Sequence, residues 1–332
     1  PRRVPELAAR WWPVAVALGG AGDAPEEGDA GLGEDRLPDL VAFEDVVGEV
    51  DRERTRRRWA RSSGGAGLEA VLGVCERGAV RVDLVRSGPH ALMAGTTGAG
   101  KSELLTSWLL QLALALPPQR LSFVLVDYKG GAAFGALTDL PHTAGLLTDL
   151  DPALTTRALT SLEAEVGRRE RLLAEYGAKD LSCLEAGAAP ARLVIAVDEF
   201  AALASAHPEV LEGLMRVAAQ GRSLGIHLIL ATQRPAGAVS PAIRANTAVR
   251  VCLQVLDAAD SVDVVGCDEA ARLGPRPGRL VVRGVEGAEH VALQAPWCGD
   301  GARVAGVVAE LGAAAAGWGE EDGWSRYVER HG

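Results

Sequence analysis

The feature that most constrains the fold of this chain is a glycine-rich segment of eight residues from Gly95 to Ser102. It reads Gly-Thr-Thr-Gly-Ala-Gly-Lys-Ser and matches G-x-x-x-x-G-K-[ST], a pattern whose backbone N–H groups wrap phosphates while its lysine reaches the β- and γ-oxygens. Three of the 34 basic residues are lysines, and Lys101 is one of them. A compact ammonium on a flexible stem suits this task, whereas the chain uses the wide guanidinium fork of arginine at almost all of its other basic positions. The segment therefore predicts a strand before it, a helix after it and a nucleotide phosphate at that helix N-terminus.

The flanking sequence repeats this alternation of strand and helix. A buried strand is predicted at His90–Ala94, and a helix that is apolar over most of its surface is predicted at Ser102–Leu116. Other apolar runs predict strands at 80–85, 121–126, 193–197, 226–231, 248–255 and 279–282, and helices are expected at 49–61, 152–174 and 210–224. This order predicts an α/β fold, with a mostly parallel sheet covered by helices on both faces.

Composition narrows the classes of function. The net charge is -10 and aromatic residues make up 4%, which argues against a dedicated nucleic-acid binder but leaves open a motor that grips DNA through local loops. The five cysteines contain no C-x-x-C pair, so we expect reduced thiols and neither a metal site nor a disulfide framework. No signal peptide is visible, and the apolar stretch 11–18 is shorter than the roughly 20 residues of a membrane span. We therefore expect a cytoplasmic chain, with a place at the cytoplasmic face of the membrane left open if it belongs to a longer protein.

Two carboxylates follow the predicted strand at 193–197. In a parallel sheet, ligands bind beyond the carboxyl ends of the strands, so Asp198 and Glu199 are expected beside the glycine-rich segment. Asp198 is expected to orient the shell of a Mg²⁺ ion to which Ser102 supplies an oxygen ligand. Glu199 is expected to polarise the attacking water, which is the base role in phosphoryl transfer.

Polar residues also follow two other predicted strands. Gln233 comes after the run Ile226–Ala231, where an amide could sense the γ-phosphate. Lys129 follows the strand predicted at 121–126 and could face the nucleotide, a subunit boundary or solvent.

Taken together, these motifs resemble the FtsK/SpoIIIE family of RecA-like motor ATPases. The resemblance rests on five segments in this order: Gly88–Glu103, Val126–Gly131, Val197–Phe200, Gly225–Leu228 and Ala231–Pro235. The chain is most similar to the branch that contains the EccC/EssC ATPases of type VII secretion and related actinobacterial proteins with forkhead-associated domains. The resemblance covers roughly 37–293 and implies a RecA-like P-loop NTPase core.

The family resemblance also implies site residues and partners. It implies ATP and Mg²⁺ as cofactors, catalytic roles for Lys101, Glu199 and Gln233, and metal contacts from Ser102 and Asp198. Nucleotide contacts are implied for Gly95, Thr96, Thr97, Gly98, Ala99, Gly100, Lys101, Ser102, Glu103 and Lys129. Members work as rings, usually hexamers, with ATP at subunit boundaries. The implied partners are further copies of the chain, a protein substrate or secretion machinery, or double-stranded DNA, in an assembly that can be membrane-associated.

One position departs from the family pattern. Members usually carry, after a serine, an arginine that reaches the neighbouring subunit's γ-phosphate, and here Val262 follows Ser261. Because such an arginine contributes about 10³ to 10⁵ in turnover, its loss could leave this chain slow. Arg244 or Arg250 could substitute, although both could equally be ordinary surface arginines.

Four regions and three functions are expected. Residues 1–36 are predicted as a linker or the end of an upstream region, 37–88 as a lead-in that packs on the core, 89–300 as the ATPase domain and 301–332 as a C-terminal helix with a loose tail. The leading hypothesis is an ATP-hydrolysing motor that powers or regulates protein export. A DNA translocase of the same family and a nucleotide-dependent switch with little hydrolysis are the alternatives.

Overall fold

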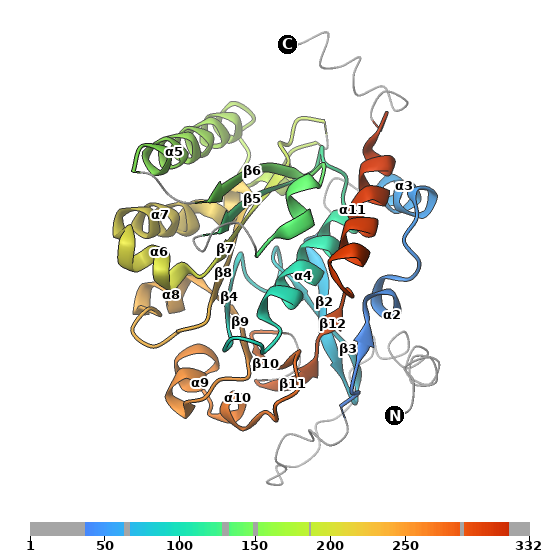
Figure 1. Ribbon diagram of the computed structural model, residues 1–332. Coiled ribbons are helices and arrows are strands. Elements are labelled where there is room, and N and C mark those ends of the chain that lie inside the picture. Colours follow the sequence, from blue (N-terminus) through green and yellow to red (C-terminus); the bar gives the residue numbers. More distant parts are fainter. Residues whose placement is uncertain are drawn as a thin grey trace, which may run out of the picture.

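The computed structural model describes residues 37–62, 67–127, 133–148, 152–185, 187–285 and 289–318. These residues form one ten-stranded sheet and a separate two-stranded sheet, with helices on both sides of the large sheet (Figure 1). In spatial order the large sheet contains β3 (Gly78–Asp83), β2 (Glu69–Cys75), β11 (Val291–Gln294), β10 (Arg279–Arg283), β9 (Val249–Leu253), β4 (His90–Ala94), β8 (Ile226–Thr232), β7 (Arg192–Asp198), β5 (Leu121–Asp127) and β6 (Thr143–Thr148). The small sheet pairs β1 (Val41–Ala42) with β12 (Pro296–Trp297).

The six consecutive strands β9, β4, β8, β7, β5 and β6 run parallel to one another. At the other edge, β10, β11, β2 and β3 pair antiparallel. The predicted fold class, a mostly parallel RecA-like sheet covered by helices on both faces, is therefore confirmed. The parallel part brings the carboxyl ends of β4, β5, β7 and β8 to one edge of the sheet.

Two hydrophobic clusters lie on opposite faces of the sheet. Within β4, Ala91 and Met93 belong to one cluster and Leu92 and Ala94 to the other, because successive side chains of a strand point to opposite faces. The first cluster is covered by α2 (Phe43–Val47), α3 (Arg52–Arg61), α4 (Lys101–Ala115), α11 (Gly301–Ala315) and the 3₁₀ helix η2 (Gly135–Asp139). The second is covered by α5 (Pro152–Glu175), α6 (Phe200–Ala206), α7 (Pro208–Leu224), α8 (Pro241–Asn246), α9 (Ala258–Val265), α10 (Glu269–Arg272) and η3 (Leu181–Cys183). Burial on both faces explains why these strands read as continuous apolar runs.

The predicted boundaries of two elements shift for local reasons. The helix expected at 49–61 begins at Arg52, because the Asp51 side chain accepts a hydrogen bond of 2.7 Å from the Arg54 N–H and caps it. The strand expected at 80–85 ends at Asp83, whose carboxylate accepts a bond of 2.8 Å from the Val85 N–H and turns the chain.

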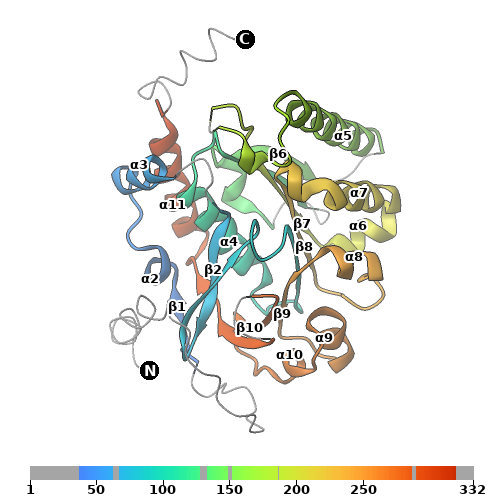
Figure 2. The same cartoon turned by 180° about the vertical axis from the view of Figure 1, so that it is seen from behind.

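Helices α3 and α11 close over the α4 side of the sheet (Figure 2). The buried Trp59 indole donates to the Ala113 carbonyl in α4 at 3.0 Å, and its ring meets that of Trp318 at a centroid distance of 5.4 Å. Arg56 Nε donates to the Ala314 carbonyl of α11 at 3.0 Å. Helix α3, which precedes the nucleotide motifs in the sequence, and helix α11, which follows them, therefore pack on the same face of the sheet. Throughout the described residues, each helix is too short or too polar to traverse a lipid bilayer.

Candidate functional site

The segment Gly95–Ser102, here called the phosphate loop, connects the carboxyl end of β4 to α4. Backbone bonds hold it to the two neighbouring strands. The Gly95 N–H donates to the Thr232 carbonyl at 3.2 Å, and both the N–H and the hydroxyl of Thr96 donate to the Gln254 carbonyl at 3.0 Å. The loop therefore has a fixed position at the edge of the sheet where β8 and β9 also end.

Gly100 lets the loop turn sharply into α4. Its φ is 95°, and a Cβ there would lie 2.7 Å from the backbone nitrogen of Gly278. Gly278 itself donates to the Ala99 carbonyl at 2.9 Å, so a second segment braces the loop from behind. The 15-residue helix α4 then begins at Lys101, and its N-terminal N–H groups and dipole favour an anion at the loop.

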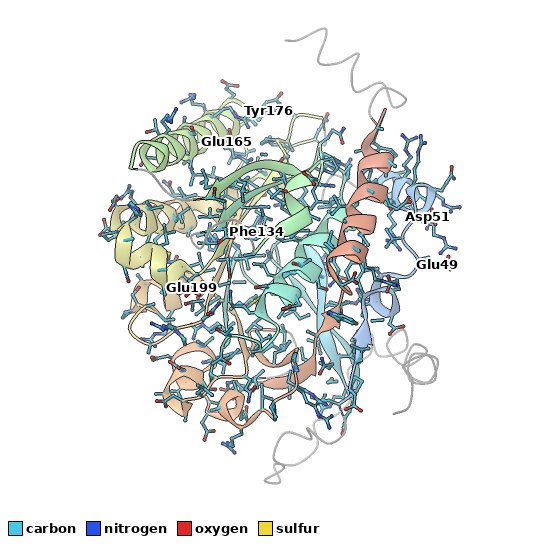
Figure 3. The ribbon with its side chains drawn as sticks, viewed as in Figure 1. Glu49, Asp51, Phe134, Glu165, Tyr176 and Glu199 are labelled. Carbon is cyan, nitrogen blue, oxygen red and sulfur yellow. The ribbon has the colours of Figure 1, made fainter. Side chains whose placement is uncertain are left out.

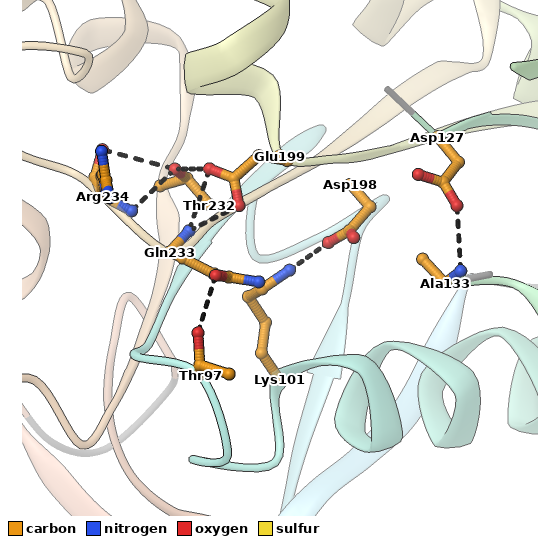
Figure 4. A network of polar contacts seen from close by, with 9 residues as sticks. All are labelled: Thr97, Lys101, Asp127, Ala133, Asp198, Glu199, Thr232, Gln233 and Arg234. Atoms are coloured by element: carbon orange, nitrogen blue, oxygen red, sulfur yellow. Dashed lines mark hydrogen bonds and ion pairs between the residues drawn. The ribbon is translucent and has the colours of Figure 1, made fainter. Parts of the chain in front are cut away.

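Lys101 and Asp198 form a buried ion pair at the centre of the site. Each residue is 4% exposed, and Lys101 Nζ donates to Asp198 Oδ1 (Figure 4). Asp198 is the last residue of β7, so the pair joins the phosphate loop to the next strand but one. A buried ammonium without a partner would cost several kcal/mol, so Asp198 is the group that balances its charge.

Glu199 follows Asp198 with its side chain fixed toward the end of β8. The residue is 3% exposed, and its φ of 58° makes it, among the residues that the structure describes, the one non-glycine position with left-handed φ. Its carboxylate accepts from the Thr232 hydroxyl at 2.9 Å and from the Gln233 N–H at 3.2 and 3.3 Å. Figure 3 shows Glu199 at the start of α6, beside the strand ends. These bonds place a carboxylate beside the Lys101–Asp198 pair.

Gln233 connects β8 to the phosphate loop. Its Oε1 accepts a hydrogen bond of 2.9 Å from the Thr97 hydroxyl, while its backbone N–H holds Glu199 (Figure 4). A cavity of about 670 Å³ opens beside Glu199 and Gln233, between α6 and the segment 234–238. The cavity therefore borders Glu199 on the side of α6.

The structure brings most of the predicted site residues together. Ser102 is half-buried and Glu103 exposed in the first turn of α4, and Thr97 and Gly98 are exposed at the tip of the phosphate loop. Lys129 lies outside the described residues.

Two residues without a predicted role also belong to the site. Thr232 holds Glu199, and the buried Asp127 at the end of β5 accepts from the Ala133 N–H at 2.9 Å. Thr232 lies in the segment Ala231–Pro235 and Asp127 in the segment Val126–Gly131, both of which carry the family resemblance. Each residue directly follows a predicted strand, and this position is the sequence signal that could have indicated it.

The arginines considered as substitutes for the missing family arginine are bound within the chain. Arg244 pairs with Asp263 at 2.8 Å, and Arg250 donates to the carbonyls of Thr247 and Arg244 at 3.1 and 2.7 Å. Val262 on α9 is 49% exposed.

Comparison with known proteins extends the picture. The FtsK/SpoIIIE family matches residues 50–191 and 184–237. The type VII secretion system protein EssC of Staphylococcus aureus (strain Mu50 / ATCC 700699) is 36% identical over 275 residues, covering 79% of this chain and 18% of EssC. The ESX secretion system protein YukB of Bacillus subtilis (strain 168) is 34% identical over 251 residues, covering 71% of this chain and 17% of YukB. The chain thus spans less than a fifth of the length of these curated relatives.

Solved structures of type VII secretion ATPases are also similar to this chain. The cytoplasmic domain of the Thermomonospora curvata type VII secretion ATPase EccC superposes with a TM-score of 0.72 at 28% identity, covering 82% of this chain and 34% of that structure. ATPases 2 and 3 of the same EccC, in complex with a signal sequence peptide, give a TM-score of 0.66 at 25% identity, covering 76% of this chain and 48% of that structure. The chain therefore belongs to the FtsK/SpoIIIE family, as an ATPase domain homologous to the type VII secretion motor ATPases EssC and EccC.

Proposed function

We propose that the domain binds ATP with Mg²⁺ at the phosphate loop and hydrolyses it with Glu199 as the base. The observation that carries this proposal is the buried Glu199 carboxylate, which Thr232 and Gln233 hold beside the Lys101–Asp198 pair. The oxygen of a water would attack the γ-phosphorus while its proton passes to Glu199, and the bond from the γ-phosphorus to the bridging oxygen would break. A buried carboxylate fixed by hydrogen bonds is positioned for this step without reorganisation.

The Lys101–Asp198 pair gives the site a way to receive its charged ligand. On binding, Lys101 would turn to the β- and γ-phosphates, and Asp198 and Ser102 would hold the Mg²⁺ that neutralises phosphate charge. Lys101 and Asp198 would each exchange the other for a charged group of the ligand, so neither buried charge would be left without a partner. N–H groups from Thr97 to Lys101 would wrap the phosphates, with Gly95, Thr96 and Glu103 flanking them. Lys129 is proposed to contact the nucleotide, and Gln233 to report the γ-phosphate to the loop through Thr97.

We further propose that copies of the domain assemble into a ring, a hexamer as in the family, and power or regulate protein export. EssC, YukB and EccC carry secretion in their names, and EccC binds a signal sequence peptide. We also propose a place on the cytoplasmic side of a membrane-bound secretion machinery, which the similarity to the cytoplasmic domain of EccC supports. The region 89–300 would be the motor, and the segments 37–88 and 301–332 would pack on it.

Val262 favours a second candidate, a nucleotide-dependent switch with little hydrolysis. The position is exposed on α9, and both Arg244 and Arg250 are engaged within the chain. A site with its own base but no arginine from a neighbour would bind ATP and turn it over slowly.

ATP turnover per subunit separates these functions when it is measured over a range of protein concentrations, with and without linear duplex DNA at physiological salt. A rate that rises with protein concentration and does not change when DNA is added is the expected result for a ring ATPase with protein cargo. Strong stimulation by DNA would instead identify a DNA translocase and contradict the export proposal. A flat, very low rate with intact ATP binding would identify the switch.

A further inference from the structure

Three side chains with metal-binding groups meet at the corner between α9 and α10. The ligand atoms of Cys267, Glu269 and His290 all lie within 4.8 Å of one another, and each residue is half-buried. Cys267 Sγ is 3.0 Å from Glu269 Oε2. Cys267 lies in the connection between α9 and α10, Glu269 is the first residue of α10, and His290 immediately precedes β11. The cysteine spacing predicted no metal site, because His290 is distant in sequence and is brought near only by the fold.

The backbone around these residues is held by a buried hydroxyl. The Ser261 Oγ, in a residue with 0% exposure, donates to the Cys267 carbonyl at 2.5 Å and accepts from the Ala270 N–H at 3.1 Å. These two bonds fix the backbone on both sides of the segment that carries Cys267 and Glu269. Gly266, with a φ of 89°, turns the chain from α9 into this segment.

A further contact orients the histidine. His290 Nε2 lies 2.9 Å from the Val265 carbonyl, which can accept its N–H. A histidine that binds a metal through one ring nitrogen commonly donates the other N–H to a backbone carbonyl, which fixes the tautomer and the ring plane. With Nε2 engaged in this way, Nδ1 would be the nitrogen that binds a cation.

The donor set fits one class of ion. A thiolate, a carboxylate and an imidazole together suit a borderline divalent cation such as Zn²⁺, and two negative ligands balance its charge. Ligands at about 2.0–2.3 Å around a tetrahedral ion are separated by roughly 3.4–3.8 Å. Atoms that already lie within 4.8 Å of one another can reach these separations through side-chain rotation. Two positive groups approach the corner: Arg283, which contacts the Val265 carbonyl at 3.4 Å, and Arg272, which pairs with Asp268 beside Cys267 and Glu269.

We propose that Cys267, Glu269 and His290 bind a divalent cation of the zinc class, with a water in the fourth position. The Cys267 thiol gives its proton to solvent when the bond from sulfur to metal forms, so binding releases one proton and transfers no electrons. The cation would tie the α9–α10 corner to the start of β11. It would thereby stiffen α9, the helix that carries Val262.

Cobalt spectroscopy tests this site on the full chain, without a histidine tag, after chelator treatment and in the absence of nucleotide. Co²⁺ bound to a thiolate gives a near-ultraviolet charge-transfer band, and Zn²⁺ should displace it. The variants Cys267→Ser and His290→Gln each remove one ligand, and Cys183→Ser removes an exposed thiol on η3 as the matched control. Thermal unfolding of each variant without metal checks that it folds.

The band should form with one Co²⁺ per chain in the parent and in Cys183→Ser, and Zn²⁺ should raise the unfolding temperature of both. Loss of a residue that only hydrogen-bonds to a metal ligand weakens metal binding by about 10–100-fold. Removal of a ligand itself in folded His290→Gln should therefore weaken binding by about 100-fold or more. Cys267→Ser should lose the band. A parent chain without the band, or a band of equal strength in either ligand variant, would overturn the proposal. Neither result depends on ATP hydrolysis, so this test stands apart from that of the proposed function.

Discussion

At the scale of single residues, Glu199 is held in a backbone conformation that a side chain disfavours. A left-handed non-glycine residue costs about 1–2 kcal/mol, and here three hydrogen-bond contacts from Thr232 and Gln233 offset that cost. The turn points the carboxylate toward the end of β8 instead of along β7. We infer that the strain positions the base before nucleotide arrives.

Thr232→Val should slow ATP turnover while leaving ATP binding unchanged. The substitution keeps the shape of the side chain but removes the donor to Glu199, which lies 2.9 Å away. A hydrogen bond to a charged group contributes about 1.5–3 kcal/mol, so turnover should fall by about 10–100-fold. Steady-state turnover and equilibrium nucleotide binding measure the two effects separately.

Thr138→Val is the matched control for this prediction. Thr138 is half-buried in η2, and its hydroxyl donates to the Gly135 carbonyl at 3.0 Å instead of to a residue of the site. Its turnover should equal that of the parent. If Thr232→Val also matched the parent, the bond from Thr232 would not position Glu199.

Sequence predicted the acidic pair but not the residue that orients it. Asp198 and Glu199 could be assigned because they follow an apolar strand downstream of a phosphate motif. Thr232 could not, because its role depends on the left-handed turn at Glu199, which no local pattern at 198–199 reveals. Likewise, the contact between Thr97 and Gln233 joins residues 136 positions apart.

At the scale of elements, the buried parallel strands were the easiest to predict. The run His90–Ala94 coincides with β4, because strands covered on both faces are apolar throughout. By contrast, the sequence missed β2, β6 and β11 of the large sheet and both strands of the small sheet. β6 contains threonines and a glycine and has an alternately exposed face, β11 is four residues long, and β2 lies in an edge segment outside the alternating pattern.

Helix α9 carries the position that tests how copies of the domain meet. Val262→Arg should raise ATP turnover per subunit at protein concentrations where copies associate, because it restores a cation that could reach the neighbouring site. Such arginines raise turnover by about 10³–10⁵-fold in their own enzymes. An arginine placed without its natural surroundings should still raise turnover by at least about tenfold. Turnover measured against concentration detects the gain.

Val262→Leu serves as the control for α9, since it changes size but adds no charge. The leucine variant should keep the parent rate at every concentration. A rate in Val262→Arg equal to that of Val262→Leu, in samples shown to be associated, would mean that α9 does not face a neighbouring nucleotide.

At the scale of the whole molecule, buried histidines make stability depend on pH. His142 is 2% exposed between the rings of Trp59 and Phe123, and burial lowers its pKa to about 4. His227 is buried as well, and burial lowers its pKa to about 3. Both are neutral in the folded chain, whereas in the unfolded chain they gain protons below about pH 6.5.

The contribution of neutral His142 to the free energy of unfolding should therefore be complete above pH 6.5. The free energy of unfolding should fall as the pH drops from 6.5 toward 4. The unfolded state binds more protons in this window, so each such histidine contributes a slope of about 1.4 kcal/mol per pH unit. Urea unfolding across this range measures the slope. His142→Gln, which cannot titrate, should show a shallower slope by that amount. Parallel curves for the two proteins would show that His142 does not stay neutral in the folded chain.

The most direct test of the central claim compares ATP turnover by the parent chain and by Glu199→Gln, with ATP binding measured on the same samples. The amide keeps the shape of the side chain and can still contact Thr232, but it cannot take the proton of the attacking water. If Glu199 is the base, Glu199→Gln should bind ATP as the parent does and turn it over about 10²–10⁴-fold more slowly. Equal turnover in the two proteins, with ATP bound to both, would contradict the assignment of hydrolysis to this site.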